Sequence, residues 1–298
     1  MEIISLRQRM MSVAREIRRA GNRTIGFVPT MGALHAGHLS LVQAAGARCD
    51  VVVASVFVNP AQFGPKEDFA AYPRDLTHDS ALLTDCQVDY VFAPTVEDIY
   101  PKGFSTYVTV EGLSEGLEGA ARPGHFRGVT TIVALLLNII RPDFAFFGQK
   151  DAQQAIVITQ MVRDLAFDSE VVVLPTARAE SGLALSSRND YLDDEHRSAA
   201  TVLYRSLSRA AAEYDEGERN TARLIEAVKS TVATEPLARL DYVSVNDAET
   251  LEPLGELGDR TALISMAVFI GKTRLIDNVV LGKAKEQDAA KARVHSLP

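Results

Sequence analysis

Short apolar runs alternate with segments of helical periodicity through the first part of the chain. The runs are nearly continuous rather than alternating, which is typical of strands covered on both faces. They are TIGFVP (24–29), VVVASVFV (51–58), VDYVFAP (88–94), DFAFFG (143–148) and SEVVVL (169–174). The helical candidates span 6–20, 38–48, 75–86, 128–141 and 151–165. This order predicts an α/β fold with a Rossmann-like parallel sheet and helices on both faces.

The pattern changes after about residue 176. Helical patterns near 193–214 and 220–234 precede LDYVSVN (240–246) and TALISMAVFI (261–270), which favour antiparallel strands. We therefore expect two domains. Residues 1–176 form the sheet domain, and residues 177–298 form a smaller α+β domain that carries the loop around Ser186, with a polar tail from about 282.

Composition narrows the class of protein. The 298 residues are 47% hydrophobic and 23% charged, as in soluble globular proteins. A net charge of −8 argues against nucleic acid as the main partner. The longest apolar run, VALLLNII (133–140), is far shorter than the roughly 20 residues that span a bilayer, and the N-terminus lacks a signal-peptide pattern. We expect a cytoplasmic protein without membrane contact, whose Cys49 and Cys86 are reduced and buried.

Two histidines follow the first predicted strand, within PTMGALHAGH (29–38). Ligands of parallel sheets bind beyond the carboxyl ends of the strands, and a helix N-terminus attracts phosphate. His35 and His38 lie one helical turn apart, and Gly32 and Gly37 permit close backbone approach. This pattern favours a phosphate site. A capped turn with exposed histidines is the structural alternative, and a zinc site lacks a third ligand at convincing spacing.

Three further loops carry polar side chains beyond predicted strands. Ser186 and Ser187 precede Arg188 in SGLALSSRNDYL (181–192), a combination suited to clamping polyphosphate, although a helix N-cap is the alternative. GQKDAQQ (148–154) and FVNPAQF (57–63) have candidate phosphate and substrate contacts, with a capping acid and an Asn-Pro turn as alternatives. Their candidate residues are Lys150, Asp151, Gln154, Asn59 and Gln62.

Together these motifs resemble those of the pantothenate synthetase (pantoate–β-alanine ligase) family of the nucleotidylyltransferase superfamily. The matching words are PTMGALHAGH, FVNPAQF, YPRD, EGAARPGHFRGV, FFGQKD, LALSSRN and RLIDN, spread over residues 24 to about 280. The resemblance implies that ATP and pantoate form pantoyl adenylate and pyrophosphate. The β-alanine amine then displaces AMP to give pantothenate. It also implies Mg²⁺ with the ATP, a cytoplasmic homodimer and a place in coenzyme A synthesis.

The resemblance also implies roles for individual residues. His35, His38 and Lys150 would be catalytic, and His38 is the family's usual proton donor. ATP would contact Met31, His35, His38, Gly148, Lys150, Asp151, Ala177, Leu185, Ser186, Ser187 and Arg188. The substrate side would comprise Gln62, Gln154, Asn59 and Arg122, with Gln62 also placing β-alanine. His125 and Arg127 share the motif of Arg122 without a specific role. No protein ligand is assigned to Mg²⁺, for which Asp79 is a weak candidate.

One residue departs from the family pattern, and three other functions are alternatives. The family commonly has Asp where this chain has Ser181, so we expect slightly weaker ATP binding without loss of activity. Another nucleotidylyltransferase is the nearest alternative, and β-alanine-dependent AMP release distinguishes it. A non-catalytic nucleotide-binding module would be expected to lack one phosphate motif or the lysine. A tRNA-charging enzyme is disfavoured by the acidic charge and by the absence of an anticodon-binding extension.

Overall fold

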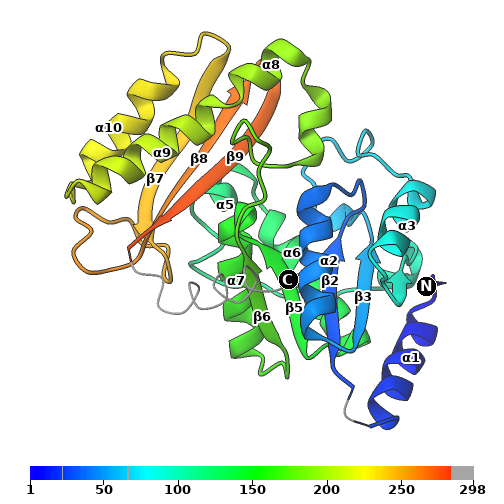
Figure 1. Ribbon diagram of the computed structural model, residues 1–298. Helices are drawn as coiled ribbons and strands as arrows, with labels where there is room; N and C mark the ends of the chain where they lie inside the picture. Colours follow the sequence, from blue (N-terminus) through cyan, green and yellow to red (C-terminus); the bar gives the residue numbers. More distant parts are fainter. Residues whose placement is uncertain (22, 66, 283–298) are drawn as a thin grey trace. The chain divides into compact units, whose positions relative to one another are not determined.

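The computed structural model describes residues 1–21, 23–65 and 67–282, and it divides into two compact units (Figure 1). The first unit comprises Met1–Arg178 and Leu185–Ser187, and the second comprises Ala179–Ala184 and the chain from Arg188 onward. The chain therefore passes between the units more than once near residue 180. The sequence analysis predicted a single boundary, at residue 176. Apart from Gly282, the predicted polar tail lies outside the described residues.

A parallel sheet of six strands forms the centre of the first unit, in the order β1-β4-β3-β2-β5-β6. Every neighbouring pair is parallel, which confirms the predicted sheet. The strands are β1 (Glu2–Ile4), β2 (Ile25–Thr30), β3 (Val51–Val56), β4 (Tyr90–Phe92), β5 (Phe144–Gly148) and β6 (Glu170–Leu174). The sequence analysis did not predict β1, because three residues are too few to show a periodicity.

Helices cover both faces of this sheet, as predicted. The helices α1 (Arg7–Arg19), α6 (His125–Ile140) and α7 (Ala152–Asp164) share one apolar cluster with strand residues such as Val53. The helices α2 (Ala36–Arg48) and α3 (Leu76–Asp85) share another with strand residues such as Ala54. Consecutive positions of β3 thus face opposite clusters, which explains why its sequence is apolar without alternation. Short helical segments complete the unit: α4 (Val96–Ile99), α5 (Glu118–Ala121), η1 (Pro60–Gln62) and η2 (Gln149–Asp151).

The strand order reverses between β2 and β5. From β2 the chain moves to β3 and then β4 on one side, whereas β5 pairs with the other edge of β2 and continues to β6. The carboxyl ends of two strands that meet at such a reversal form the usual ligand site of an open parallel sheet. Here those ends lead into residues 31–35 and into η2.

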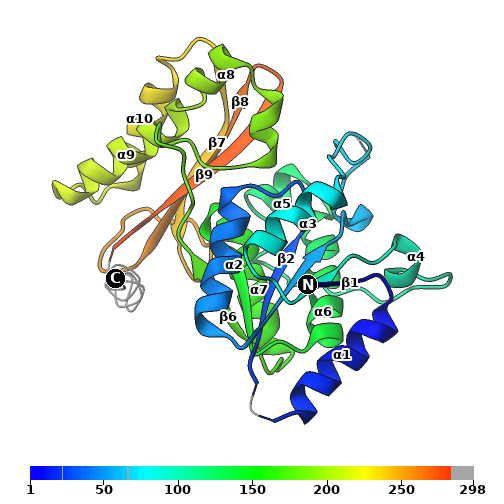
Figure 2. The same cartoon turned by 45° about the vertical axis from the view of Figure 1, so that its right-hand side comes forward.

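The second unit is a three-stranded antiparallel sheet covered by helices (Figure 2). Its strands are β7 (Ala238–Asp247), β8 (Ala262–Ile270) and β9 (Thr273–Leu281), and its helices are α8 (Asp194–Ala199), α9 (Val202–Asp215) and α10 (Thr221–Val232). The short segment η3 (Ser187–Tyr191) precedes them. Leu207 of α9 and Leu224 of α10 share a cluster with Met266 of β8. The sequence analysis did not predict β9 as a strand, and the helix expected near 193–214 is interrupted between α8 and α9.

Candidate active site

The turn after β2 has an unusual backbone. Gly32 and Ala33 follow one another with φ of +81° and +50°. Asp79 of α3 holds this turn, because its Oδ2 accepts the backbone N–H of Ala33 at 3.1 Å and its Oδ1 accepts that of Leu34 at 2.9 Å. The Asp79 side chain is buried, with 1% of its residue surface exposed. Hydrogen bonds to α3 therefore fix the conformation of this turn, which directly precedes α2.

An imidazole pair begins α2. His35 is the N-cap, and its Nδ1 accepts the Gly37 backbone N–H at 3.1 Å. His38 closes the capping box, because its Nδ1 accepts the His35 backbone N–H at 3.4 Å. The two ring centroids lie 4.1 Å apart. A neutral imidazole whose Nδ1 is an acceptor carries its proton on Nε2. We therefore assign the Nε2–H tautomer to both rings, so each can donate one hydrogen bond.

The protein keeps His38 neutral. The pKa of His38 is lowered to about 3, chiefly because burial desolvates the ring and secondarily because His35 lies beside it; the Asp151 carboxylate opposes this shift and the Lys150 ammonium adds to it. Lys150 and Asp151 thus act electrostatically on the ring, and the Lys150 Nζ lies 3.5 Å from the Asp151 Oδ1. At neutral pH the His38 ring is therefore uncharged, with its proton on Nε2.

Gly37 has a steric reason to be glycine. A Cβ at this position would lie 2.9 Å from Cε1 and 3.0 Å from Nδ1 of His35, closer than real Cβ contacts. It would also lie 3.6 Å from the Cβ of Ala177, so Ala177 adjoins the turn. The Leu185 backbone N–H donates to the Ala177 carbonyl at 2.9 Å. Leu185, which directly precedes Ser186, is therefore hydrogen-bonded to a residue beside the histidine turn, and both belong to the first unit.

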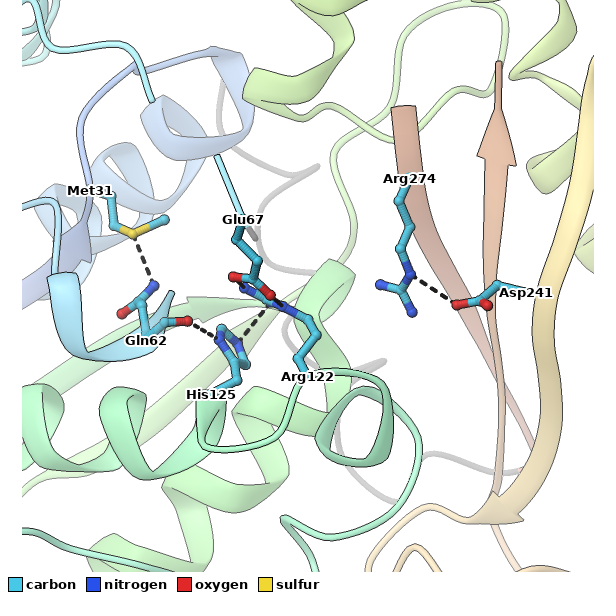
Figure 3. Close-up of polar contacts among 7 residues, drawn as sticks. All are labelled: Met31, Gln62, Glu67, Arg122, His125, Asp241 and Arg274. Atoms are coloured by element: carbon cyan, nitrogen blue, oxygen red, sulfur yellow. Dashed lines mark hydrogen bonds and ion pairs between the residues drawn. The ribbon is translucent and has the colours of Figure 1, made fainter. Parts of the chain in front are cut away.

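Gln62 and Asn59 form a network of buried amides, of which Figure 3 shows Gln62 beside Met31. Its Nε2 lies 2.9 Å from the Met31 Sδ, and its Oε1 accepts the Asn59 Nδ2 at 3.0 Å. Asn59 is fully engaged. Its Nδ2 also donates to the Gly128 carbonyl at 3.1 Å, and its Oδ1 accepts the Ala61 N–H at 3.2 Å and the Tyr100 hydroxyl at 2.8 Å. Asn59 therefore orients Gln62.

Gly128 lets α6 touch η1. A Cβ at Gly128 would lie 2.2 Å from the carbonyl oxygen of Ala61 and 2.6 Å from the backbone nitrogen of Gln62. Only glycine permits this approach of two backbones. Gly128, the second glycine of GHFRG, thus helps to place Gln62. The spacing of residues in the sequence does not indicate this role.

A second polar cluster adjoins Gln62 and consists of Glu67, Arg122 and His125 (Figure 3). Arg122 makes a bidentate ion pair with Glu67 at 2.7 and 2.8 Å, and its Nη1 lies 3.1 Å from the His125 Nε2. The His125 Nδ1 lies 2.8 Å from the Gln62 carbonyl oxygen. Because that oxygen only accepts and the guanidinium only donates, His125 carries its proton on Nδ1. Burial and the Arg122 charge lower the pKa of His125 to about 4.

The remaining predicted residues lie as follows. Gly148 ends β5, Lys150 and Asp151 form η2, and Gln154 is half-buried in the first turn of α7. Within the described part of the chain the Gln154 amide makes no hydrogen bond, so it is available to a ligand. Its neighbour Gln153 instead holds residues 113–118 through three hydrogen bonds. Ser186 and Ser187 belong to the first unit, and Arg188 belongs to the second.

Several sequence motifs have structural roles. The Arg127 guanidinium lies over the Tyr107 ring, 3.6 Å from its centroid. Arg274 of RLIDN pairs with Asp241 at 3.0 Å and ties β9 to β7 (Figure 3). Ser181 is exposed, one position before Gly182, where a Cβ would lie 2.0 Å from the Tyr204 ring.

The structure also bears on metals, thiols and membranes. Among residues 1–21, 23–65 and 67–282, no three histidine, cysteine or acidic residues are grouped to hold a metal ion. Cys49 and Cys86 are free, as predicted, but they are half-buried rather than buried, and desolvation raises the pKa of Cys49 to about 11. In the same described ranges, no helix has the length and apolar character to cross a bilayer.

Comparison with known proteins shows the family of this chain. The model of the pantoate-beta-alanine ligase family matches residues 2–280. The pantothenate synthetase of Herpetosiphon aurantiacus is 56% identical over 257 residues, which cover 86% of this chain and 93% of that protein. The crystal structure of pantothenate synthetase from Thermus thermophilus has 47% identity and a TM-score of 0.88, covering 94% of this chain and 99% of that one. The pantoate-beta-alanine ligase of Francisella tularensis, crystallised with beta-gamma ATP and beta-alanine, has 36% identity and a TM-score of 0.77, covering 94% and 97%. The chain therefore belongs to the pantoate–β-alanine ligase family.

Proposed function

We propose that this chain activates pantoate as pantoyl adenylate at the carboxyl ends of β2 and β5. ATP-dependent ligation of pantoate to β-alanine is the reaction of its family. The observation that carries the proposal is the imidazole pair, whose Nδ1 atoms both accept backbone N–H groups and whose Nε2–H groups are thereby committed as donors.

In the first step, a pantoate carboxylate oxygen attacks the α-phosphorus and pyrophosphate leaves. Negative charge builds up on the phosphate oxygens as the bond to the leaving group breaks. Preorganised donors stabilise such charge without reorganising during the reaction. In our proposal the Nε2–H groups of His35 and His38 and the Lys150 ammonium are these donors, and His38 acts without giving up its proton. Ser186, Ser187 and Arg188 bind the phosphates, with Met31, Gly148, Asp151, Ala177 and Leu185 along the nucleotide.

Gln62 and Gln154 hold pantoate in this proposal. Asn59 fixes the Gln62 amide, whereas the Gln154 amide makes no internal hydrogen bond among the described residues. Holding the carboxylate in line with the α-phosphorus lowers the barrier to adenylation, because the two reacting groups are already aligned when they bind. The protein therefore needs no covalent intermediate of its own for this step. Arg122 is our candidate for the residue that binds a substrate carboxylate. That carboxylate would have to displace Glu67 from the Arg122 guanidinium.

In the second step, the β-alanine amine attacks the acyl carbon and AMP leaves. The adenylate is a good leaving group, so the step requires mainly that Gln62 and its surroundings place the amine. Mg²⁺ would accompany the ATP phosphates and neutralise part of their charge. The Asp79 carboxylate does not fit a metal ligand, because it is buried and both oxygens accept backbone N–H groups. A cytoplasmic homodimer, as in the resemblance, is part of the proposal, and sedimentation tests the oligomeric state.

Isotope transfer tests the adenylate. Pantoate labelled with ¹⁸O in its carboxylate should pass one labelled oxygen to AMP during turnover, because that oxygen bridges the acyl and phosphoryl groups. Release of ADP with label in inorganic phosphate would instead indicate an acyl phosphate and contradict the proposal. Release of pyrophosphate without any β-alanine-dependent release of AMP would favour the competing nucleotidylyltransferase function, because that class of enzyme keeps the nucleotide in its product.

A further inference from the structure

The backbone N–H groups of the turn after β2 already have partners within the chain. The Gly32 N–H donates to the Thr30 hydroxyl at 3.1 Å, and the N–H groups of Ala33 and Leu34 donate to Asp79. Successive N–H groups of a turn with left-handed residues commonly form an anion-binding concavity. In this chain a resident carboxylate occupies that position. The phosphates must then be met by side chains, foremost the imidazoles that follow the turn.

Asp79 and the turn depend on each other. A buried carboxylate is costly unless hydrogen bonds satisfy it, and no ion pair of Asp79 is found among the described residues. The turn in its place is strained, because Ala33 adopts a φ of +50°. A Cβ on Gly32 would lie 2.7 Å from the Asp79 Oδ2, so the glycine also makes room for the carboxylate. Strained backbone of this kind persists where its surroundings over-determine it.

We propose that Asp79 is a positioning residue for adenylation: its carboxylate fixes the backbone of Ala33 and Leu34 and thereby places His35 and His38 against the phosphates. Leu34 directly precedes the His35 N-cap, and His35 in turn orients His38 through the capping box. The inference rests on the proposed adenylation, and it assigns Asp79 a role through other residues rather than through contact with substrate.

The Asp79→Asn variant tests this role. The amide keeps the size of the side chain, but its NH₂ group faces a backbone N–H and loses one of the two hydrogen bonds. We expect pantoate-dependent exchange of pyrophosphate into ATP to slow roughly 10- to 100-fold, as for an approximately 1 Å displacement of catalytic groups. The KM for β-alanine should stay within about twofold, because the substitution displaces groups that contact ATP and leaves the binding of β-alanine unchanged. Asp75→Asn is the matched control on the same helix, since asparagine caps as well as aspartate.

A second variant perturbs the same contact from the other side. Gly32→Ala should give the same selective loss of exchange, and the double variant should lose less than the product of the single losses. Imidazole ¹⁵N spectra give a readout independent of turnover. Both histidines should show neutral Nε2–H signals in the unaltered protein, and these should shift in Asp79→Asn but not in Asp75→Asn.

Several results would overturn the role of Asp79. They are an unchanged exchange rate in Asp79→Asn, equal losses in exchange and in β-alanine affinity, or restoration of the rate by excess Mg²⁺ or Mn²⁺, which would make Asp79 a metal ligand. Exchange absent from the unaltered enzyme would refute the proposed adenylation instead. In that case, unmoved imidazole signals would still refute the positioning of the two histidines by Asp79, whereas shifted signals would support that positioning without a role in adenylation.

Discussion

Replacing Gly37 by alanine should separate activity from stability. The new Cβ would lie 2.9 Å from Cε1 and 3.0 Å from Nδ1 of His35. Ordinary contacts of carbon atoms are about 3.5–4.0 Å, so the imidazole must move by roughly 0.5–1 Å. Because Gly37 also donates the hydrogen bond that fixes the His35 tautomer, the ring loses its orientation as well as its place.

Two opposed effects act on stability. Alanine in a helix is favoured over glycine by about 1 kcal/mol. Loss of the N-cap interaction costs about 0.5–2 kcal/mol. The free energy of unfolding should therefore change by no more than about 1 kcal/mol. Turnover should fall roughly 100-fold, the loss expected when a catalytic group is displaced by about 1 Å.

Steady-state assays of AMP release and urea unfolding curves measure the two quantities. Gly46→Ala is the matched control, because it lies on the same helix α2 and its Cβ would meet only the Val52 Cγ2 at 4.0 Å. It should gain about 1 kcal/mol of stability and keep full activity. Full turnover in Gly37→Ala would refute the placement of His35 in the reaction.

Three more predictions concern the two histidines with lowered pKa values, Gly128 and Ser181. The pKa values of His38 and His125 are lowered to about 3 and about 4, so the unfolded chain binds these protons first. Their contribution to stability is complete above about pH 6.5 and is lost as the pH falls through that range toward 4 and 3; unfolding curves at about pH 7.5 and about pH 5 that coincide would contradict this. Gly128→Ala should destabilise the protein by about 3 kcal/mol or more, measured by thermal unfolding, because its Cβ would overlap the Ala61 carbonyl. Ser181→Asp should leave turnover intact and tighten the apparent KM for ATP slightly, and a collapse of turnover would show that the loop is misread.

The sheet could be predicted because burial on both faces leaves a direct trace in sequence. Val51–Val56 is apolar at five of its six positions, and the chain order of such runs with helices between them limits the topology. The sequence analysis did not predict strands β1 and β9. The first has three residues, and in β9 the charged Arg274 and Asp277 and the polar Thr273 and Asn278 interrupt the apolar residues.

The candidate site was predictable where chemistry sits in one short segment. His35 and His38 are indicated by their spacing, and Lys150 by its place after a strand. The supporting residues depend on pairs distant in sequence, such as Glu67 with Arg122, 55 positions apart, and Asp79 with Leu34, 45 positions apart. One sequence contains no signal for such pairs, because many acids and arginines could pair equally well until the fold selects among them.

A crystal structure with a non-hydrolysable ATP analogue and pantoate would test the central claim most directly. The account predicts phosphate oxygens within about 3 Å of Nε2 of both His35 and His38, the range of charge-assisted hydrogen bonds. The pantoate carboxylate should lie beside Gln62 and in line with the α-phosphorus. A triphosphate bound away from these imidazoles, or held by the Ala33 and Leu34 backbone after displacement of Asp79, would contradict it.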